Sequence, residues 1–337
     1  MKFDVIIGNP PYQLSDGSGG STDAAMPIYP KFIEQAQKLE PKFLSMIIPS
    51  KWMVGGRGLD MFRKKMFEDR HIKKMFDFED ASVCFAGIHL DGGVCYFLWE
   101  QDYSGNIEYT YQTKSGQELV KNRILGNDYF KFVIRDNRVI DLLKHLDLKK
   151  NETNISQNFS SIVSSTKPFG VRKDLFNAPA KYPQSGLKME PFADSIKIFG
   201  VKGLKGGAKR RTGYVHQTFI QTGPIKDWKI FFTTTYSTGA IHYPDVILGE
   251  PMDTCTETFL VIGPFSTQEE RDNCLKYMET QFFKALLYFG KGTMQVTRIV
   301  FSLIPLLDWK QPWTDEQLHT MFDLTEDQIQ LIERLFE

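Results

Sequence analysis

The stretch Asn9-Pro10-Pro11-Tyr12 holds the clearest chemistry in the chain. The Asn9 side-chain oxygen and the Pro10 carbonyl can accept both hydrogens of an exocyclic amino group, while the Tyr12 ring stacks on the base that carries it. Accepting both hydrogens draws the nitrogen toward tetrahedral geometry and frees its lone pair to attack a methyl group. This step needs no general base at its start, and neither His nor Glu lies nearby in the sequence. The four residues predict a clamp for a planar amine.

A short apolar strand positions this turn. Val5, Ile6 and Ile7 form a continuous β-branched run, the pattern of a strand buried on both faces of a parallel sheet, and Gly8 ends it. The two prolines that follow prevent strand or helix from continuing. The backbone should therefore leave the carboxyl end of a strand, which is where open α/β sheets bind their ligands.

The tetrapeptide resembles motif IV of the N6-adenine DNA methyltransferases, with the signature (Asn/Asp/Ser)-Pro-Pro-(Tyr/Phe/Trp). The resemblance implies methyl transfer from S-adenosylmethionine to an extruded adenine, with Asn9, Pro10, Pro11 and Tyr12 as the catalytic residues. It also implies that Gly8, Asn9 and Pro10 form part of the cofactor site. The same signature occurs in methyltransferases that act on protein glutamine, so it indicates the chemistry better than the substrate. The alternative is a proline-stiffened turn with an incidental tyrosine, which ordinary residue frequencies produce in about one chain in a thousand.

The resemblance extends over residues 1–100. Segments 47–53, 76–78 and 92–98 follow one another in the order seen in restriction-modification methylases of the gamma type. By that likeness, Phe85 matches the motif VIII aromatic residue that packs near the flipped adenine. A core phenylalanine is the alternative for Phe85, because aromatic side chains are commonly buried.

The position of the motif departs from the family pattern. The family places a Gly-rich S-adenosylmethionine loop, an acidic residue for the ribose and further strands before the motif, whereas eight residues precede Asn9 here. Gly203 and the Gly206-Gly207 pair lie among lysines, outside a strand-to-helix context, and do not replace that loop. We therefore expect an incomplete cofactor site, completed by an upstream methyltransferase or nuclease segment or by a partner subunit.

The element pattern predicts an α/β fold. Strands expected at 43–48, 72–78 and 93–99 alternate with helices at 27–39 and near 59–67, which indicates a partial doubly wound, Rossmann-like methyltransferase sheet. This domain should span residues 1–150, with 105–150 as a linking part. Residues 151–337 should form a mixed α+β target-recognition domain, with a helix over 269–289 and an acidic helical tail capped in part by Thr325.

Charge is segregated along the chain although the net charge is zero. Residues 166–232 hold 13 Lys or Arg against 4 Asp or Glu, and 306–337 hold 2 against 8. A basic stretch with scattered aromatics predicts double-stranded DNA as the partner, although a solvated charge run is the alternative. The expected DNA contacts are cations on an irregular, Gly-rich loop and two polar residues after a helix break: Lys202, Lys205, Lys209, Arg210, Arg211, Thr293 and Gln295.

Composition narrows the remaining functions. A hydrophobic content of 42% and a charged content of 24% are typical of soluble globular proteins, and no signal peptide or membrane span is predicted, so we expect a cytoplasmic protein. The four cysteines are widely spaced, and we expect no metal site. The polar segment 15–23 is either a flexible surface loop, or a mobile lid or DNA-contacting loop that becomes ordered on substrate binding.

Two other functions compete with DNA methylation. The first is a DNA-binding specificity module without activity of its own, because its cofactor site is incomplete. The second is protein-glutamine methylation, which gives no use for a long basic second domain.

Overall fold

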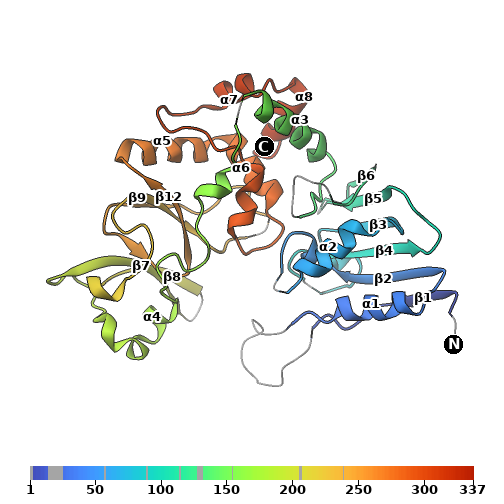
Figure 1. The fold of residues 1–337 in the computed structure, drawn as a ribbon, viewed down its shortest axis with the longest axis horizontal. Coiled ribbons are helices and arrows are strands. Elements are labelled where there is room, and N and C mark those ends of the chain that lie inside the picture. Colours follow the sequence, from blue (N-terminus) through green and yellow to red (C-terminus); the bar gives the residue numbers. More distant parts are fainter. Residues whose placement is uncertain are drawn as a thin grey trace. The chain divides into compact units, whose positions relative to one another are not determined.

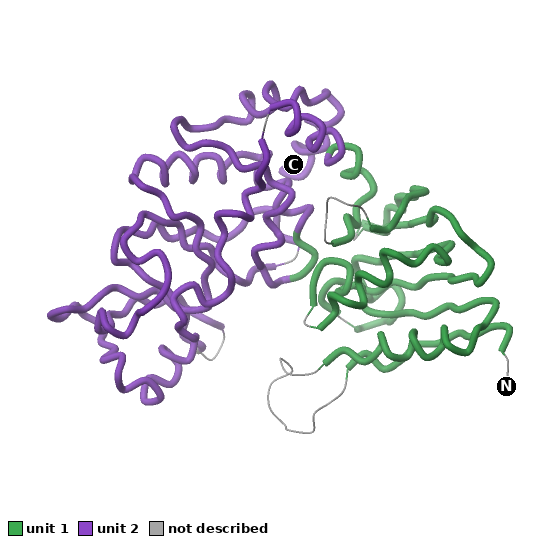
Figure 2. Tube along the Cα trace, viewed as in Figure 1, with its two compact units in different colours: residues 1–142, 291–293 green, residues 143–290, 294–337 purple. Residues whose placement is uncertain are grey.

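A computed structural model of the chain describes residues 3–13, 26–56, 58–88, 90–113, 115–126, 132–153, 155–204, 207–237 and 239–337. The chain divides into two compact units, residues 1–142 with 291–293 and residues 143–290 with 294–337 (Figure 2). The division falls inside helix α3 (Val139–Glu152), near the domain boundary expected after residue 150.

The first unit is built on one six-stranded mixed sheet (Figure 1). The parallel pairs are β1 with β2 and β3 with β5, and the other neighbours are antiparallel. In spatial order the strands are β1 (Val5–Gly8), β2 (Phe43–Pro49), β4 (Val94–Glu100), β3 (Ile72–Phe78), β5 (Ile107–Gln112) and β6 (Glu118–Arg123). Residues 107–123, which the sequence placed in a linking part, thus extend the six-stranded sheet of the first unit.

Helices α1 (Tyr29–Lys38) and α2 (Asp60–Glu68) connect the first strands and lie on one face of the sheet (Figure 1). Side chains alternate along β2, so that Leu44, Met46 and Ile48 are buried in the same core as Ile33 of α1 and Phe62 of α2. The sequence pattern predicted both helices and these strands within a few residues of their bounds. The α/β fold class is confirmed.

The second unit contains two small sheets and most of the helices (Figure 1). One sheet is antiparallel, in the order β10 (Ile247–Gly249), β9 (Trp228–Thr233), β12 (Phe259–Phe265), and the other has the order β11 (Thr254–Cys255), β7 (Ser195–Leu204), β8 (Gly207–His216). The remaining helices are α4 (Asp174–Asn177), α5 (Gln268–Glu279), α6 (Gln281–Gly290), α7 (Asp315–Met321) and α8 (Glu326–Glu333). Among the described residues, the short 3-10 turns are η2 (Ser50–Met53) and η3 (Ala81–Val83) in the first unit, and η4 (Phe159–Ile162), η5 (Pro179–Lys181), η6 (Pro183–Ser185), η7 (Gln217–Phe219) and η8 (Arg298–Leu303) in the second.

The helix expected over 269–289 is in fact two helices, because Thr280 interrupts it. Thr280 has an extended backbone at the end of α5, and its hydroxyl donates to the Tyr277 carbonyl and accepts from the Phe283 N–H. The side chain thereby satisfies backbone groups at both helix ends. An apolar periodicity that continues through residue 280 concealed this break.

The basic region was wrongly expected to be an irregular loop. Strands β7 and β8 pair along their whole length, from Ser195 with His216 to Leu204 with Gly207. Ile196, Ile198 and Val215 anchor one end of this hairpin in a core, while residues 207–212 are exposed. Tertiary packing at the base therefore imposes strand structure on a sequence rich in Gly and Lys.

The expected cap of the last helix is confirmed. The Thr325 hydroxyl accepts from the Gln328 N–H, and the Gln328 side chain returns to the Thr325 N–H, which is a capping box. No helix in the described part of the chain is long and apolar enough to cross a membrane.

Candidate active site

The Asn9–Tyr12 turn lies where β1 ends. Gly8 is the last residue of β1 to pair with β2, opposite Met46, so the chain leaves the sheet at Asn9. The Asn9 and Pro11 side chains are exposed, Pro10 is buried and Tyr12 is half-buried. The turn is therefore held by Pro10 and Tyr12, while the Asn9 amide is open to a ligand.

Gly8 bears on the fit of a cofactor. A Cβ added at Gly8 would meet only Met46 Cε, at 3.7 Å, so packing within the protein does not require glycine here. Close approach of a ligand to this backbone is a reason for glycine that packing does not supply. Together with the exposed Asn9 amide, Gly8 fits one side of an S-adenosylmethionine site, and this assignment stays a prediction.

Tyr12 is tied to the beginning of α1. Its carbonyl accepts from the Ile28 N–H at 3.1 Å, and Gln13 forms a bridge with Pro27. The phenol oxygen is buried, and this burial raises the pKa of Tyr12, an effect to which the Cys95 and Cys84 thiols add. The Tyr12 hydroxyl thus points inward. The polar segment 15–23 lies outside the described residues.

Phe85 belongs to the loop that follows η3. Its N–H donates to the Ala81 carbonyl at 2.9 Å, and Phe85 is half-buried, while its sequence neighbours Val83 and Ile88 are 58% and 49% exposed. This exposure disfavours the alternative of a core phenylalanine. Contact with a flipped base stays a prediction for Phe85.

A buried ionic network supports the same edge of the sheet. The Asp77 carboxylate accepts from Ser50 Oγ, from the Tyr109 hydroxyl and from Arg135 Nε, each at 2.6 Å, and from Arg135 Nη2 at 2.7 Å. Burial alone would lower the pKa of Arg135, but the Asp77 carboxylate beside it raises the pKa well above its ordinary value. The network joins the end of β2 to β3, β5 and the segment before α3. Sequence reasoning missed it, although an Asp at a core-facing position of a strand was a signal.

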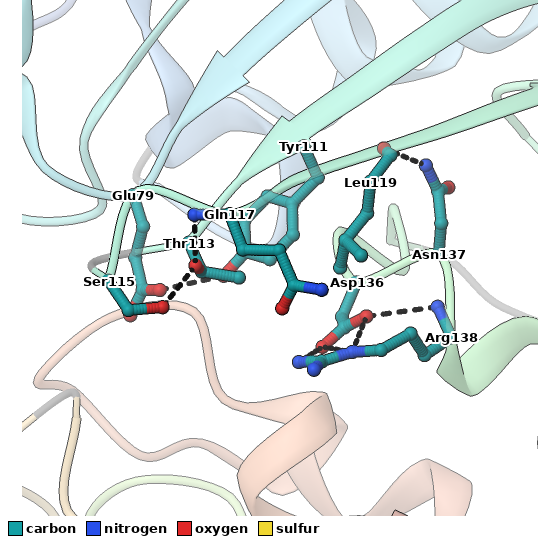
Figure 3. Close-up of polar contacts among 9 residues, drawn as sticks. All are labelled: Glu79, Tyr111, Thr113, Ser115, Gln117, Leu119, Asp136, Asn137 and Arg138. Atoms are coloured by element: carbon teal, nitrogen blue, oxygen red, sulfur yellow. Dashed lines mark hydrogen bonds and ion pairs between the residues drawn. The ribbon is translucent and has the colours of Figure 1, made fainter.

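Further polar contacts close the β5–β6 turn at the carboxyl ends of β3 and β5 (Figure 3). The Tyr111 hydroxyl donates to Glu79 Oε2 at 2.8 Å, and burial raises the pKa of Tyr111. Thr113 Oγ1 lies 2.8 Å from Ser115 Oγ and accepts from the Gln117 N–H at 3.1 Å. These contacts stabilise the rim of the sheet on its far side from β1.

Asn137 joins two strands of that rim, and Figure 3 shows its contact with Leu119. Its side-chain amide donates to the Tyr109 carbonyl of β5 at 3.0 Å and to the Leu119 carbonyl of β6 at 2.7 Å. The adjacent Arg138 pairs with Asp136, with Nη2 and Oδ2 2.6 Å apart. The segment before α3 is thereby fixed to the sheet.

The predicted DNA-contacting cations lie on the β7–β8 hairpin. Lys202 is directly opposite Lys209, Arg211 is opposite Gly200, and Arg210 is opposite Val201. Because side chains alternate along a strand, Lys202, Lys209 and Arg211 share one face and Arg210 occupies the other. Lys205 lies outside the described residues.

The two faces of the hairpin have different surroundings. Arg210 Cζ lies 5.8 Å from the centre of the buried Phe259 ring, a cation–π contact that ties Arg210 to the body of the unit. All four cations are exposed, but within the described residues no such ring contact holds Lys202, Lys209 or Arg211, and β7 and β8 contain no acidic residue. Like charges directly opposite each other destabilise a hairpin unless an anion binds between them.

Thr293 and Gln295 fall in different compact units. Thr293 is only 8% exposed, which disfavours direct contact with DNA. A Cβ on the preceding Gly292 would lie 2.3 Å from Val54 Cγ2, so segment 291–293 packs closely on the residues after η2. Gln295 is exposed and forms a bridge with Thr235.

Residues 1–85 match the model of the family described as Eco57I restriction-modification methylase. Over 120 residues the chain is 44% identical to an uncharacterized adenine-specific methylase of Mycoplasma pneumoniae (strain ATCC 29342 / M129 / Subtype 1), and the aligned part covers 34% of this chain and 28% of that protein. The chain thus spans less than a third of that relative. The predicted resemblance to restriction-modification methylases is confirmed for the first part of the chain.

Two solved structures show weaker likenesses. The type IIG restriction endonuclease BpuSI is 11% identical, with coverage of 99% of this chain and 49% of that chain and a TM-score of 0.35. The type IIL restriction-modification enzyme MmeI, in complex with DNA, is 9% identical, with coverage of 88% and 45% and a TM-score of 0.49.

Proposed function

We propose that this chain is the methyl-transfer and target-recognition part of a site-specific DNA adenine-N6 methyltransferase of a restriction-modification system, acting in the cytoplasm with S-adenosylmethionine. The observation that carries the proposal is the Asn9–Tyr12 turn at the carboxyl end of β1, inside the segment that matches the methylase family.

The turn supplies the chemistry through its own groups. Asn9 Oδ1 and the Pro10 carbonyl accept the two hydrogens of the adenine N6, and the Tyr12 ring stacks on the base. With both hydrogens held, the nitrogen lone pair is directed at the methyl group. S-adenosylmethionine, when bound, would supply that methyl as a good electrophile: the sulfur–methyl bond would break as the nitrogen–methyl bond forms, with S-adenosylhomocysteine as the leaving group. N6 would then release one proton to solvent. Pro10 and Pro11 keep the two acceptors in place because their rings restrict the backbone.

The edge of the sheet indicates how the cofactor site is completed. Strand β1 is an edge strand among the described residues, and Val5 and Ile7 are 52% and 78% exposed on the face opposite the core. The prediction that this strand is buried on both faces is therefore wrong for the described residues. The neighbouring Phe43 is 38% exposed on the same face. Parallel sheets are ordinarily covered on both faces, and apolar edge strands are ordinarily paired. A further α/β segment, on the same or another polypeptide, would cover this face and supply the rest of the cofactor site.

The second unit would hold the DNA. Three exposed cations on one face of the β7–β8 hairpin suit phosphates, which position a duplex while other side chains read the bases. A protein-glutamine substrate offers no comparable array of phosphates. We therefore favour DNA as the substrate.

Replacement of Asn9 by Ala tests the proposal. In the complete enzyme, Asn9→Ala should reduce adenine methylation by at least about 100-fold, the range typical of removing one group that stabilises a transition state. Binding to duplex DNA should change little, because the hairpin is untouched. Asn106→Ala, an exposed asparagine between β4 and β5, is the matched control. Undiminished methylation by the Asn9→Ala enzyme would refute the assignment.

The alternative of an inactive specificity module rests on the same exposed edge of β1. Calorimetric titration of this chain alone with S-adenosylmethionine separates the two functions. Stoichiometric binding would contradict an inactive module. No binding, followed by binding once the missing segment is added, would support the completed site described above.

A further inference from the structure

The two long edges of the β7–β8 hairpin differ in their hydrogen bonds. In an antiparallel pair, opposite residues alternately bond to each other and direct their backbone groups outward. The Gly203 N–H bonds outside the pair, to Asn177 Oδ1 at 2.9 Å, so Gly203 and the opposite residue Ala208 are outward residues. The same alternation makes Arg210 and Thr212 outward residues of β8.

The outer edge of β7 is closed. Strand β11 pairs with β7 as far as Phe199, and the Thr256 N–H then donates to the Phe199 carbonyl at 2.9 Å. Further along, the Asn177 side chain donates to the Val201 carbonyl at 3.5 Å and accepts from the Gly203 N–H. The outward backbone groups of β7 are thus bonded to the body of the second unit well beyond the base of the hairpin.

The outer edge of β8 is covered only at its base. There the Tyr214 N–H donates to the Lys188 carbonyl at 2.8 Å, and the Lys188 N–H donates back at 3.0 Å, as the alternation requires. Residues 207–212 are exposed, and among the described residues no group accepts from the outward N–H groups of this stretch. These donors recur at every second residue, about 7 Å apart.

Charge indicates what binds this open edge. Lys209, Arg210 and Arg211 follow one another on β8, and neither strand of the hairpin contains an acidic residue. A protein strand could pair with an open edge, but charged side chains on an edge strand are what proteins use to prevent such pairing. Phosphates accept from backbone N–H groups as well as from Lys and Arg. The outward carbonyls repel phosphate, and the adjacent cations offset that repulsion.

We propose that the open edge of β8, residues 207–212, is the surface along which one strand of duplex DNA docks. The outward N–H groups donate to its phosphates, beside the side chains of Lys209 and Arg211. The closed edge of β7 supports the hairpin and does not contact DNA. This inference rests on the proposed function, in which the second unit holds DNA, and it specifies which edge of the hairpin does so.

Amide hydrogen exchange of the complete enzyme, with and without a duplex that it binds, tests the edge directly. In the free enzyme, the outward amides of Ala208, Arg210 and Thr212 should exchange faster than the Lys209 and Arg211 amides, which donate within the hairpin. Bound DNA should slow exchange of the outward amides at least about ten-fold, because each gains an acceptor. Equally fast exchange of these amides in the bound enzyme would overturn the proposal.

Replacement of Thr212 gives a second test. Thr212→Pro removes the outward N–H without removing a bond between the two strands, as proline on an edge strand can. Thr212→Val removes the hydroxyl and keeps the N–H. In fluorescence anisotropy, Thr212→Pro should weaken duplex binding about ten-fold more than Thr212→Val does, the effect of one hydrogen bond to a charged acceptor.

Both variants should show the same dependence of affinity on salt, because neither loses a cation. Equal affinities of the two variants would contradict the assigned donor. If circular dichroism shows that Thr212→Pro unfolds the hairpin, the exchange measurement on the unmodified enzyme decides.

The possible outcomes separate this edge from the proposed function. If the enzyme binds DNA and methylates adenine while the outward amides still exchange fast, this inference alone fails. If an acidic peptide slows these amides and DNA does not, the edge binds a protein strand and the inference is again wrong. If the complete enzyme binds no duplex, the proposed function and the inference fail together.

Discussion

The two faces of the β7–β8 hairpin lead to a quantitative prediction about DNA binding. The perturbation is the triple replacement of Lys202, Lys209 and Arg211 by Ala. These residues are exposed on one face: Lys202 is directly opposite Lys209, and Arg211 lies two residues along β8 from Lys209. Their side chains contribute little to the folded hairpin, because its anchoring residues Ile196 and Val215 lie at the other end.

The magnitude follows from counterion release. Each cation that neutralises a phosphate contributes about 0.9 to the slope of log K against log salt concentration, so three contacts contribute about 2.7. The triple variant should lose that much of the slope. Between 50 and 200 mM salt, the ratio of wild-type to variant affinity should therefore shrink by about 40-fold.

Arg210 provides the matched control. It carries the same charge in the same strand but lies on the other face, over the Phe259 ring. Arg210→Met keeps an apolar contact with that ring and removes no phosphate contact. We expect the salt slope of Arg210→Met to stay within about 0.5 of the wild-type value, since less than one phosphate contact is lost.

Fluorescence anisotropy with a labelled duplex, repeated at several salt concentrations, measures both slopes. Circular dichroism of each variant confirms that the strands remain folded. If the triple variant keeps the wild-type slope, the exposed face does not contact phosphates. If Arg210→Met loses as much slope as the triple variant, the division of the hairpin into two faces is wrong.

The remaining predictions concern stability. Arg135→Met should lower the free energy of unfolding, measured by urea denaturation, by about 3–5 kcal/mol, because it leaves the Asp77 carboxylate buried without its cation. Adding Asp77→Leu to that variant should restore most of the lost stability. Gly93→Ala should lower the same free energy of unfolding by at least about 2 kcal/mol, because φ is +77° and a Cβ would clash with the Phe78 carbonyl oxygen of β3. Gly87→Ala, where φ is +76° but the surrounding space is open, should lower it less. Burial lowers the pKa of Lys229 to about 8, below its value in the unfolded chain. Between about pH 8 and 10.5 the unfolded chain therefore binds more protons, so the free energy of unfolding should rise by up to about 1.4 kcal/mol per pH unit. Lys229→Met should abolish that rise.

Local chemistry explains what the sequence alone could predict. The β-branched run before Asn9 and the two prolines after it act on their own backbone, so the strand and the turn were predictable from neighbouring residues. The same is true of Thr325 and its capping box. The methylase resemblance of residues 1–85 also depends on contiguous residues, and it is confirmed.

Contacts between distant residues account for what the sequence did not predict. Asp77 and Arg135 are 58 positions apart, and nothing in either segment indicates that the two side chains meet. The basic region became a hairpin because its base packs in a core, a constraint that no local propensity expresses.

The cations of the β7–β8 hairpin show most clearly which properties the sequence determines and which the tertiary structure determines. The sequence by itself determined that Lys202, Lys209, Arg210 and Arg211 are close together and positively charged. Only the tertiary structure decided that Arg210 lies on the opposite face from the other three cations, where its guanidinium is over the Phe259 ring. In the same way, the sequence determined that Tyr12 has the ring needed to stack on a base, while the fold decided that its hydroxyl is buried. Side-chain direction follows from the packing of whole elements, which is why residue order alone cannot supply it.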